Sequence, residues 1–384
     1  MASLMSGPAP LALFAACLPG LEPLLAEELR LLGTTPRPLG GGVAFAGDRP
    51  LLLRAHLHLG TASHVLLRCT AFPCRALGEL QRKTALLPWH EWLLPRTPYT
   101  VRATSRQSRC YHTGAIEERV RNGIAKALGV AVTDEPAEGV LAVQIAARFV
   151  QDQLTLSLDT SMTPLHRRGY RLDSRKAPLR EDLAHALLLA AGYAPGMPLL
   201  DPFCGAGTIA IEGAAIAAGL PAGRLRPTPL TGTPWFDESA WQELLNALPA
   251  APLGLLPDAS IAASDRDAGA ITATKANAER AGLAKAITAS CDALTNQPWF
   301  NTAGAAPARG LVATNPPFGI RVSGGDLGNL YQTLGHRVRT LGPGWRLAIL
   351  AHDPRLARRT GIPLRQLFAT NHGGVKVTAL ISEG

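Results

Sequence analysis

The sequence lacks any pair of cysteines at CxxC spacing and any histidine cluster at zinc-ligand spacing. Its six cysteines are scattered, which is typical of buried thiols in a reducing compartment and gives no reason to expect a metal. No apolar run reaches about 18 residues, which excludes a transmembrane helix. The apolar stretch 11–18 has no basic residue before it and Glu22 soon after it, so a signal peptide fits poorly. These absences predict a soluble, cytoplasmic protein with no membrane partner.

Charged side chains are also scarce. They make up 17% of the 384 residues, against 47% apolar residues, so a folded protein of two or three domains is expected rather than disorder. The charge is uneven, because residues 1–180 hold 22 basic and 14 acidic side chains and residues 181–384 hold 16 and 15. A basic front half predicts a module that binds a polyanion. The alternative is a generally basic protein whose arginines are simply solvated.

Apolar periodicity divides the chain. Residues 1–73 show the order strand, helix, strand, strand, helix, strand, which is that of a ferredoxin-like unit, and residues 74–160 repeat this mixed pattern. Residues 161–177 resemble a linker. From residue 178, continuous apolar strands alternate with helical patterns, which predicts an α/β doubly wound, Rossmann-like sheet buried on both faces. Residues 220–258 are too long for an ordinary loop and are interpreted as an insertion.

The first motif is the run DPFCGAGT from Asp201 to Thr208, between a predicted strand and a predicted helix. Its glycines allow a tight turn and a close approach to a ligand. No lysine follows them, which excludes a nucleoside-triphosphate loop. The alternative is a tight turn without a ligand.

Two further acids follow the next two predicted strands. Asp265 is placed to accept the ribose hydroxyls of a nucleoside, and Asp292 to accept an adenine amine. Each acid taken singly is more often an ordinary loop residue. Three acids at successive strand ends, with a glycine turn at the first, predict a nucleoside-sized crevice at the carboxyl edge of the sheet.

The last motif is Asn315, Pro316, Pro317 and Phe318, directly after the predicted strand 310–314. Two successive prolines hold the chain extended, so the Asn315 oxygen and the Pro316 carbonyl converge as two acceptors for an NH2 group. Phe318 offers a flat face to a planar base. The alternative is a proline-rich turn that only ends a strand.

These residues carry a resemblance to a known family. Asp201–Thr208 and Asn315–Phe318 look like motifs I and IV of S-adenosylmethionine-dependent amino methyltransferases. The runs 166–171 (HRRGYR), 177–179 (APL), 201–212, 14–22 and 43–48 are similar to the THUMP-domain RNA guanine-N2 methyltransferases, nearest to the bacterial 23S rRNA branch. The resemblance spans nearly the whole chain. Residues 370–374 depart from it, since the family shows a plainer Asn-Gly turn there.

The resemblance implies an N-terminal ferredoxin-like region (1–73), a THUMP RNA-binding domain (74–160), a linker (161–177) and a Rossmann-like methyltransferase domain (178–384). It implies S-adenosyl-L-methionine as the cofactor and RNA as the partner. The residues expected to bind the cofactor are Asp201, Phe203, Cys204, Gly205, Gly207, Thr208, Asp265, Arg266, Asp292 and Ala293. The residues expected to contact RNA are Arg102, Arg106, Arg109, Arg167, Arg168 and Arg171.

The expected reaction is methylation of a guanine N2 amine in 23S rRNA, with Asn315, Pro316, Pro317 and Phe318 as the catalytic residues. No acid, histidine or lysine lies within residues 314–318, so the surplus proton is expected to leave after transfer. The target base must be unpaired or flipped out of a duplex. The alternatives are a tRNA substrate, a protein-glutamine or DNA amine, and a non-catalytic RNA-binding protein.

Overall fold

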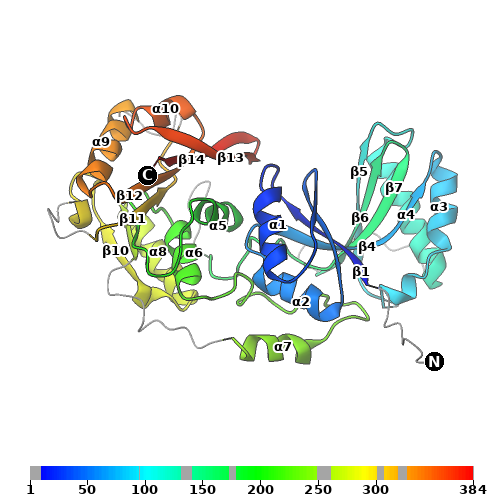
Figure 1. Ribbon diagram of the computed structural model, residues 1–384. Coiled ribbons are helices and arrows are strands. Elements are labelled where there is room, and N and C mark those ends of the chain that lie inside the picture. Colours follow the sequence, from blue (N-terminus) through cyan, green and yellow to red (C-terminus); the bar gives the residue numbers. More distant parts are fainter. Residues whose placement is uncertain are drawn as a thin grey trace, which may run out of the picture.

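The chain forms two seven-stranded sheets, one from each half, and Figure 1 shows them side by side with helices packed on each. This computed structural model describes residues 10–94, 96–130, 141–172, 179–248, 261–300, 307–318 and 327–383. Among these residues, no helix has the length and the apolar character needed to cross a membrane.

The first sheet has the strand order β2-β3-β1-β4-β7-β6-β5. Its strands are β1 (Leu11–Cys17), β2 (Arg37–Leu39), β3 (Gly42–Gly47), β4 (Ala62–Pro73), β5 (Tyr99–Arg106), β6 (Val143–Val150) and β7 (Gln153–Asp159). Its helices are α1 (Glu22–Leu31), α2 (Arg49–His58), α3 (Leu77–Ala85) and α4 (Thr113–Leu128). The predicted ferredoxin-like element order is confirmed. The long strand β4 pairs with β1 on one side and with β7 on the other, so one sheet runs through both predicted N-terminal units.

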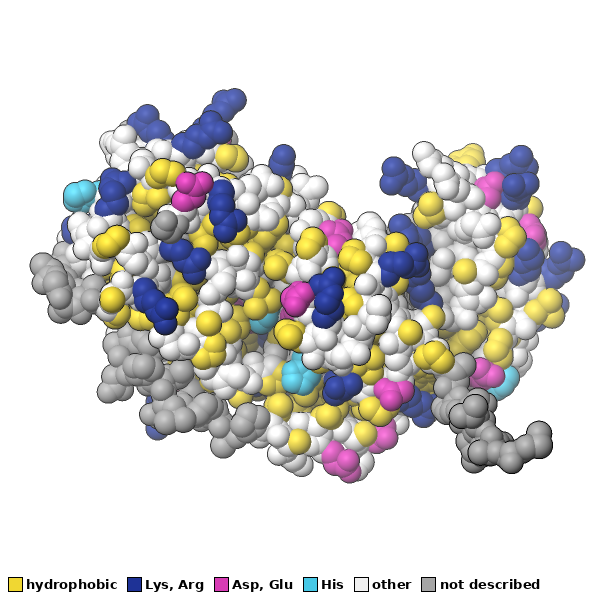
Figure 2. Space-filling model, in the orientation of Figure 1, with side chains coloured by type: hydrophobic (Ala, Val, Ile, Leu, Met, Phe, Trp, Pro, Cys, Tyr) yellow, Lys and Arg dark blue, Asp and Glu magenta, His cyan; other side chains and the backbone are white. Residues whose placement is uncertain are grey.

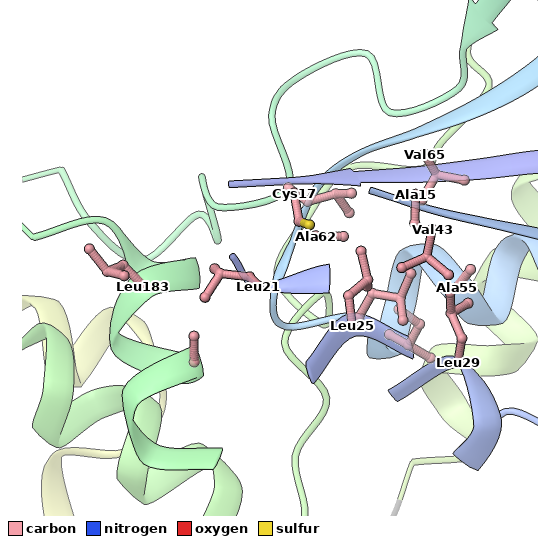
Figure 3. Close-up of a cluster of buried hydrophobic side chains, with 14 of the residues drawn as sticks. Ala15, Cys17, Leu21, Leu25, Leu29, Val43, Ala55, Ala62, Val65 and Leu183 are labelled. Carbon is pink, nitrogen blue, oxygen red and sulfur yellow. The ribbon is translucent and has the colours of Figure 1, made fainter. Parts of the chain in front are cut away.

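One face of this sheet is apolar and lies against the helices. Side chains alternate between the two faces of a strand, and the buried ones, such as Ala15 and Val65, share the face that α1 and α2 cover (Figure 3). Figure 3 also shows Leu21 beside Leu183 of α5 (Glu181–Ala190), which belongs to the second half. The hydrophobic core is therefore continuous between the halves.

The second sheet has the order β10-β9-β8-β11-β12-β14-β13, which confirms the predicted doubly wound α/β fold. Its strands are β8 (Leu199–Asp201), β9 (Ile261–Asp265), β10 (Ile287–Cys291), β11 (Gly310–Thr314), β12 (Trp345–Ala351), β13 (Leu364–His372) and β14 (Val375–Ser382). Besides α5, its helices are α6 (Thr208–Ala217), α8 (Ala268–Arg280), α9 (Leu327–Thr340) and α10 (Pro354–Arg358). The chain order reverses between β8 and β11, and ligands of such sheets bind outside the carboxyl ends of the strands at this switch point.

The last hairpin contains a strand that periodicity did not predict. β13 pairs with β14 across the two-residue turn of Gly373 and Gly374. The register shifts between Gln366 and Phe368, and this bulge breaks the alternation by which a strand is recognised in sequence. The Gly-Gly turn therefore closes a regular hairpin where the sequence departs from the family pattern.

The described part of the predicted insertion, residues 220–248, runs back along the first half. The Gly223 amide donates to the Leu57 carbonyl, the Thr97 hydroxyl to the Gly232 carbonyl, and the Trp235 indole to the Glu91 carbonyl. The helix α7 (Glu238–Asn246) ends this segment and buries Trp241. The insertion is thus a second connection between the halves, and its residues 249–258 lie outside the described part of the chain.

A buried network of polar side chains lies where the halves meet, and we call it the junction. Arg168 is buried, and its guanidinium donates to the carbonyls of Leu165 and Gly60 and lies 3.6 Å from the Glu212 carboxylate. Glu212 of α6 also accepts from the Tyr170 hydroxyl and from His185, each at 3.0 Å. The prediction that Arg168 contacts RNA is wrong, because its charge is used inside the protein.

Candidate active site

A cavity of about 650 Å³ opens at the carboxyl edge of the second sheet, beside the switch point. Its lining contains every predicted cofactor and catalytic residue except Gly207. Because the carboxyl ends of parallel strands meet at one edge, residues 60 to 113 positions apart in sequence reach the same space. A volume of this size suits a nucleoside-containing ligand, since small-molecule sites span about 300–1,000 Å³.

The turn from Asp201 to Thr208 forms the floor of this cavity. Gly205 has a φ of +54°, and a Cβ added there would meet no atom of the other described residues within 4 Å. The backbone therefore lies bare at this point. Gly207 has a different role, because a Cβ there would lie 2.8 Å from Thr274 Cγ2. It allows α6 to pack closely on α8 rather than lining the cavity.

Asp201 connects the turn to the acceptor motif. Its carboxylate accepts from the Thr314 hydroxyl at 2.7 Å, and Thr314 directly precedes Asn315. It also accepts from the Phe203 amide. Burial raises the pKa of Asp201 to about 7, because these two hydrogen bonds only partly offset the loss of water.

The second and third acids lie side by side on neighbouring strands. Asp265 accepts from the Gly205 and Asp267 amides at 3.1 and 3.0 Å, so it braces the glycine turn. The Asp292 amide donates to the Asp265 carbonyl, which holds the two strand ends together. Both side chains are partly exposed and line the cavity. They stay candidates for the ribose and adenine contacts.

The acceptor motif carries an unsatisfied polar atom. Asn315 Oδ1 is buried and has no hydrogen-bond partner within the part of the chain that the structure describes. Pro316 is buried beside it, and Pro317 and Phe318 also line the cavity. A buried oxygen without a partner costs free energy unless a ligand donates to it. This atom therefore indicates where an NH donor of the substrate binds.

His352 is a site residue that the sequence did not reveal. It follows β12, and its ring stacks on that of Phe318 with centroids 3.3 Å apart and planes 25° apart. One face of Phe318, predicted to receive the base, is therefore covered by a protein ring. The sequence signal that could have revealed His352 is its position at the carboxyl end of a strand, which the three acids share.

The other arginines that were predicted to contact RNA fall into two groups, those that are exposed and one that is paired inside the protein. Arg102, Arg106, Arg109 and Arg167 are exposed. Arg171 is half-buried, donating to the Leu179 carbonyl and forming an ion pair with Glu181 at 2.7 Å. The four exposed side chains remain candidates for RNA contact, whereas Arg171 belongs to the junction.

The strand order and the crevice at its switch point define a class I methyltransferase, an enzyme that takes its methyl group from S-adenosylmethionine. Residues 168–374 match the family model described as the RMKL-like methyltransferase domain, and residues 12–66 match the RlmL ferredoxin-like domain. The chain belongs to this RMKL-like methyltransferase family.

The relatives agree with this assignment. The chain is 34% identical over 384 residues to a ribosomal RNA large subunit methyltransferase K/L of Syntrophotalea carbinolica, covering 97% of this chain and 53% of that protein. It is 31% identical over 379 residues to a Synechocystis protein provisionally named an RNA methyltransferase, covering 96% and 95%. It thus spans about half the length of the K/L relatives and nearly all of the cyanobacterial one.

A solved structure, SMU.472, provisionally classed as a methyltransferase and complexed with SAH, has a TM-score of 0.83 to this chain. The identity is 25%, with 98% of this chain and 99% of that chain covered. The residues present here fit the same kind of donor. The bare turn at Gly205, the acids Asp265 and Asp292 and the cavity volume provide room and acceptors for a nucleoside.

Proposed function

We propose that the chain methylates the exocyclic N2 amine of a guanine in 23S ribosomal RNA. The observation that carries the proposal is that Asn315, in the lining of a cavity that fits S-adenosylmethionine, has a buried Oδ1 without a hydrogen-bond partner among the described residues. The basic first half and the rRNA relatives support RNA as the substrate. A tRNA substrate is the alternative, and the experiment below distinguishes the two.

The bound cofactor supplies a methyl group on a positively charged sulfur. Asp265 and Asp292 accept hydrogen bonds from its nucleoside, and the turn at Gly205 allows close contact. Asp201, held by Thr314, ties this donor side to the acceptor side, so the two substrates are positioned by one hydrogen-bonded unit. Holding the reacting atoms in line contributes most of the rate enhancement in such a site.

The acceptor side orients a weak nucleophile. The guanine amine has its lone pair delocalised into the ring. Asn315 Oδ1 and the Pro316 carbonyl accept its two hydrogens, which favours the geometry in which the nitrogen can attack. The Phe318 ring bounds the base. Burial raises the pKa of the Cys204 thiol, which keeps it neutral and unsuited to attack. The surplus proton leaves to water after transfer.

A methyl-transfer assay with the purified chain tests this proposal. The purified chain is incubated with labelled S-adenosylmethionine and unmodified 23S rRNA, and the nucleosides are identified by mass spectrometry. Labelled N2-methylguanosine in 23S rRNA supports the proposal, and the same product in tRNA alone supports the alternative. Labelled N6-methyladenosine, or no product with either RNA, overturns the guanine assignment. Nucleosides from the rRNA and tRNA of a deletion strain provide the check in cells.

A further inference from the structure

One face of the first sheet is covered by none of the helices that the structure describes. Most buried apolar side chains of β1, β4, β6 and β7 point to the helices, so residues of the opposite parity form the other face. We call this the open face. The strand register shows which residues belong to the open face, because paired residues of neighbouring strands point to the same side of the sheet.

The open face carries a line of arginines. Arg68 of β4 pairs with Ser157, Ser157 with Ala146, and Ala146 with Arg102, so Arg68 and Arg102 share a row. By the same register, the members of the line in strand order are Arg37, Arg68, Arg148, Arg102 and Arg106. They extend from β2 to β5, the two edge strands. Six inter-strand spacings of about 4.8 Å carry the line across roughly 29 Å.

Little negative charge balances this line. Of the strand residues on the open face, only Asp159 is acidic, and it is buried in an ion pair with His64 at 2.7 Å. Arg37, Arg68 and Arg148 have no carboxylate within ion-pair distance among the described residues. Burial lowers the pKa of Arg68, and the like charges of Arg148 and Arg37 lower it further. Such a cluster is destabilising unless an anion is bound there.

The face is also ordered and accessible. The Arg68 guanidinium lies 4.6 Å from the centroid of the Phe14 ring, a cation–π contact that holds the charge at the sheet surface. Arg37, Arg102, Arg106 and Arg148 are exposed. Figure 2 shows a notch between the parts of the first half that Figure 1 labels α1 and β5, with Lys and Arg side chains along its wall. A polyanion lying on this face would reach toward the catalytic domain.

We propose that the open face of the first sheet is the surface that binds the RNA backbone, with Arg37, Arg68 and Arg148 as its core. This inference rests on the proposed function for the identity of the polyanion. It places the contact on a surface that both N-terminal units build together, rather than on residues 74–160 alone. Arg37, Arg68 and Arg148, which have no carboxylate partner among the described residues, suit phosphates, and phosphates are bound without regard to base sequence.

The test compares two charge-matched double variants. Arg37→Gln with Arg148→Gln removes two exposed charges from the open face. Arg54→Gln with Arg82→Gln removes two exposed charges from α2 and α3, on the opposite, helical side of the same sheet. Binding of 23S rRNA is measured across a salt series without the methyl donor. Binding of SAH, by calorimetry, verifies that each variant is folded.

The open-face variant is expected to bind RNA about tenfold more weakly. The slope of its log–log salt plot is expected to fall by about 1.5, because each lost phosphate contact removes about 0.7 to 0.9. The helical-side variant should match the wild type. Equal losses in both variants, or a loss in neither, would overturn the proposal. If the wild-type chain binds RNA through this face but transfers no methyl group to it, the proposed function fails and the surface stands.

Discussion

The cavity and the junction each contain a fully buried acid, and the two acids have opposite surroundings. Glu212 at the junction has Arg168, His185 and Tyr170 as partners. Burial alone would raise the pKa of Glu212, but the charge of Arg168 and the contacts with His185 and Tyr170 together outweigh burial and lower this pKa to about 2. Asp201 at the cavity accepts from one hydroxyl and one amide among the described residues, and burial raises its pKa to about 7. They are 11 residues apart, since Asp201 begins the glycine turn and Glu212 lies in the middle of the helix α6 that follows it.

The different surroundings of Glu212 and Asp201 distinguish a cluster that stabilises the fold from a site that binds a ligand. At the junction the buried charges face opposite charges, Arg168 with Glu212 and Arg171 with Glu181. At the cavity Asn315 Oδ1 has no hydrogen-bond partner among the described residues, and the raised pKa of Asp201 keeps that acid near the point where it would ionise. Unsatisfied polar groups and displaced pKa values are the marks of a site that a ligand completes.

The largest effect is expected at the junction. Glu212→Gln keeps the shape of the side chain but leaves Arg168 buried without its charge partner, which costs about 3–5 kcal/mol of unfolding free energy. Urea denaturation measures the loss. Glu27→Gln is the control, since its ion pair with Arg30 is exposed (side chains 63% and 53% accessible) and should contribute almost nothing. Equal losses in the two variants would contradict the role given to burial.

The next effect concerns turnover. Asn315→Ala should reduce methyl transfer about a hundredfold or more, because the lost oxygen acts mainly when the amine reacts. The affinity for SAH should change little, and the protein should unfold normally. Single-turnover kinetics with the RNA substrate measure the rate. A wild-type rate would remove Asn315 from the acceptor site.

Donor affinity is the third comparison. Asp265→Ala should weaken S-adenosylmethionine binding by roughly 1.5–3 kcal/mol for each hydrogen bond lost to the charged oxygen. Asp267→Ala is the control, because that side chain caps α8 through the Gly269 amide. Calorimetry gives both values. Unchanged affinity in a folded Asp265→Ala protein would exclude the ribose contact.

The smallest effect is a pH dependence of opposite sign at the two acids. Because the folded-state pKa of Asp201 is raised, its cost to stability grows as pH rises from about 4 to about 7. Asp201→Asn keeps an acceptor oxygen without the charge. The melting temperature of this variant minus that of the wild type should therefore increase by a few degrees as pH rises over this range. The stability that Glu212 contributes is complete above about pH 4.5 and is lost as pH falls toward about 2. Melting curves at several pH values test both signs, and a gap between Asp201→Asn and wild type that stays constant from about pH 4 to 7 would contradict the first.

Most of the cavity could be predicted from sequence because its parts are local. A strand end, a glycine turn and a helix start are adjacent at residues 199–212, and Asn315 to Phe318 follow a strand in the same way. Once the fold is a parallel sheet, the carboxyl ends of its strands must converge. His352 was missed because the residues after β12 contain no comparable motif. The close packing of Gly207 on Thr274 could not be predicted either, because it joins two helices that lie far apart in the sequence.

The rest depends on partners that lie far apart in the chain. Arg168 looked like one more basic residue of an exposed segment, and only its neighbours Gly60 and Glu212 show that it is buried. The open face depends on register, since a shift of one residue would turn Arg68 and Arg148 toward the core. The sequence by itself determined the elements, the methyltransferase motifs and the excess of positive charge in the first half. Only the tertiary structure decided which charges are neutralised inside and which face outward, because the free energy of a charge depends on burial and on neighbours that the chain brings together by folding.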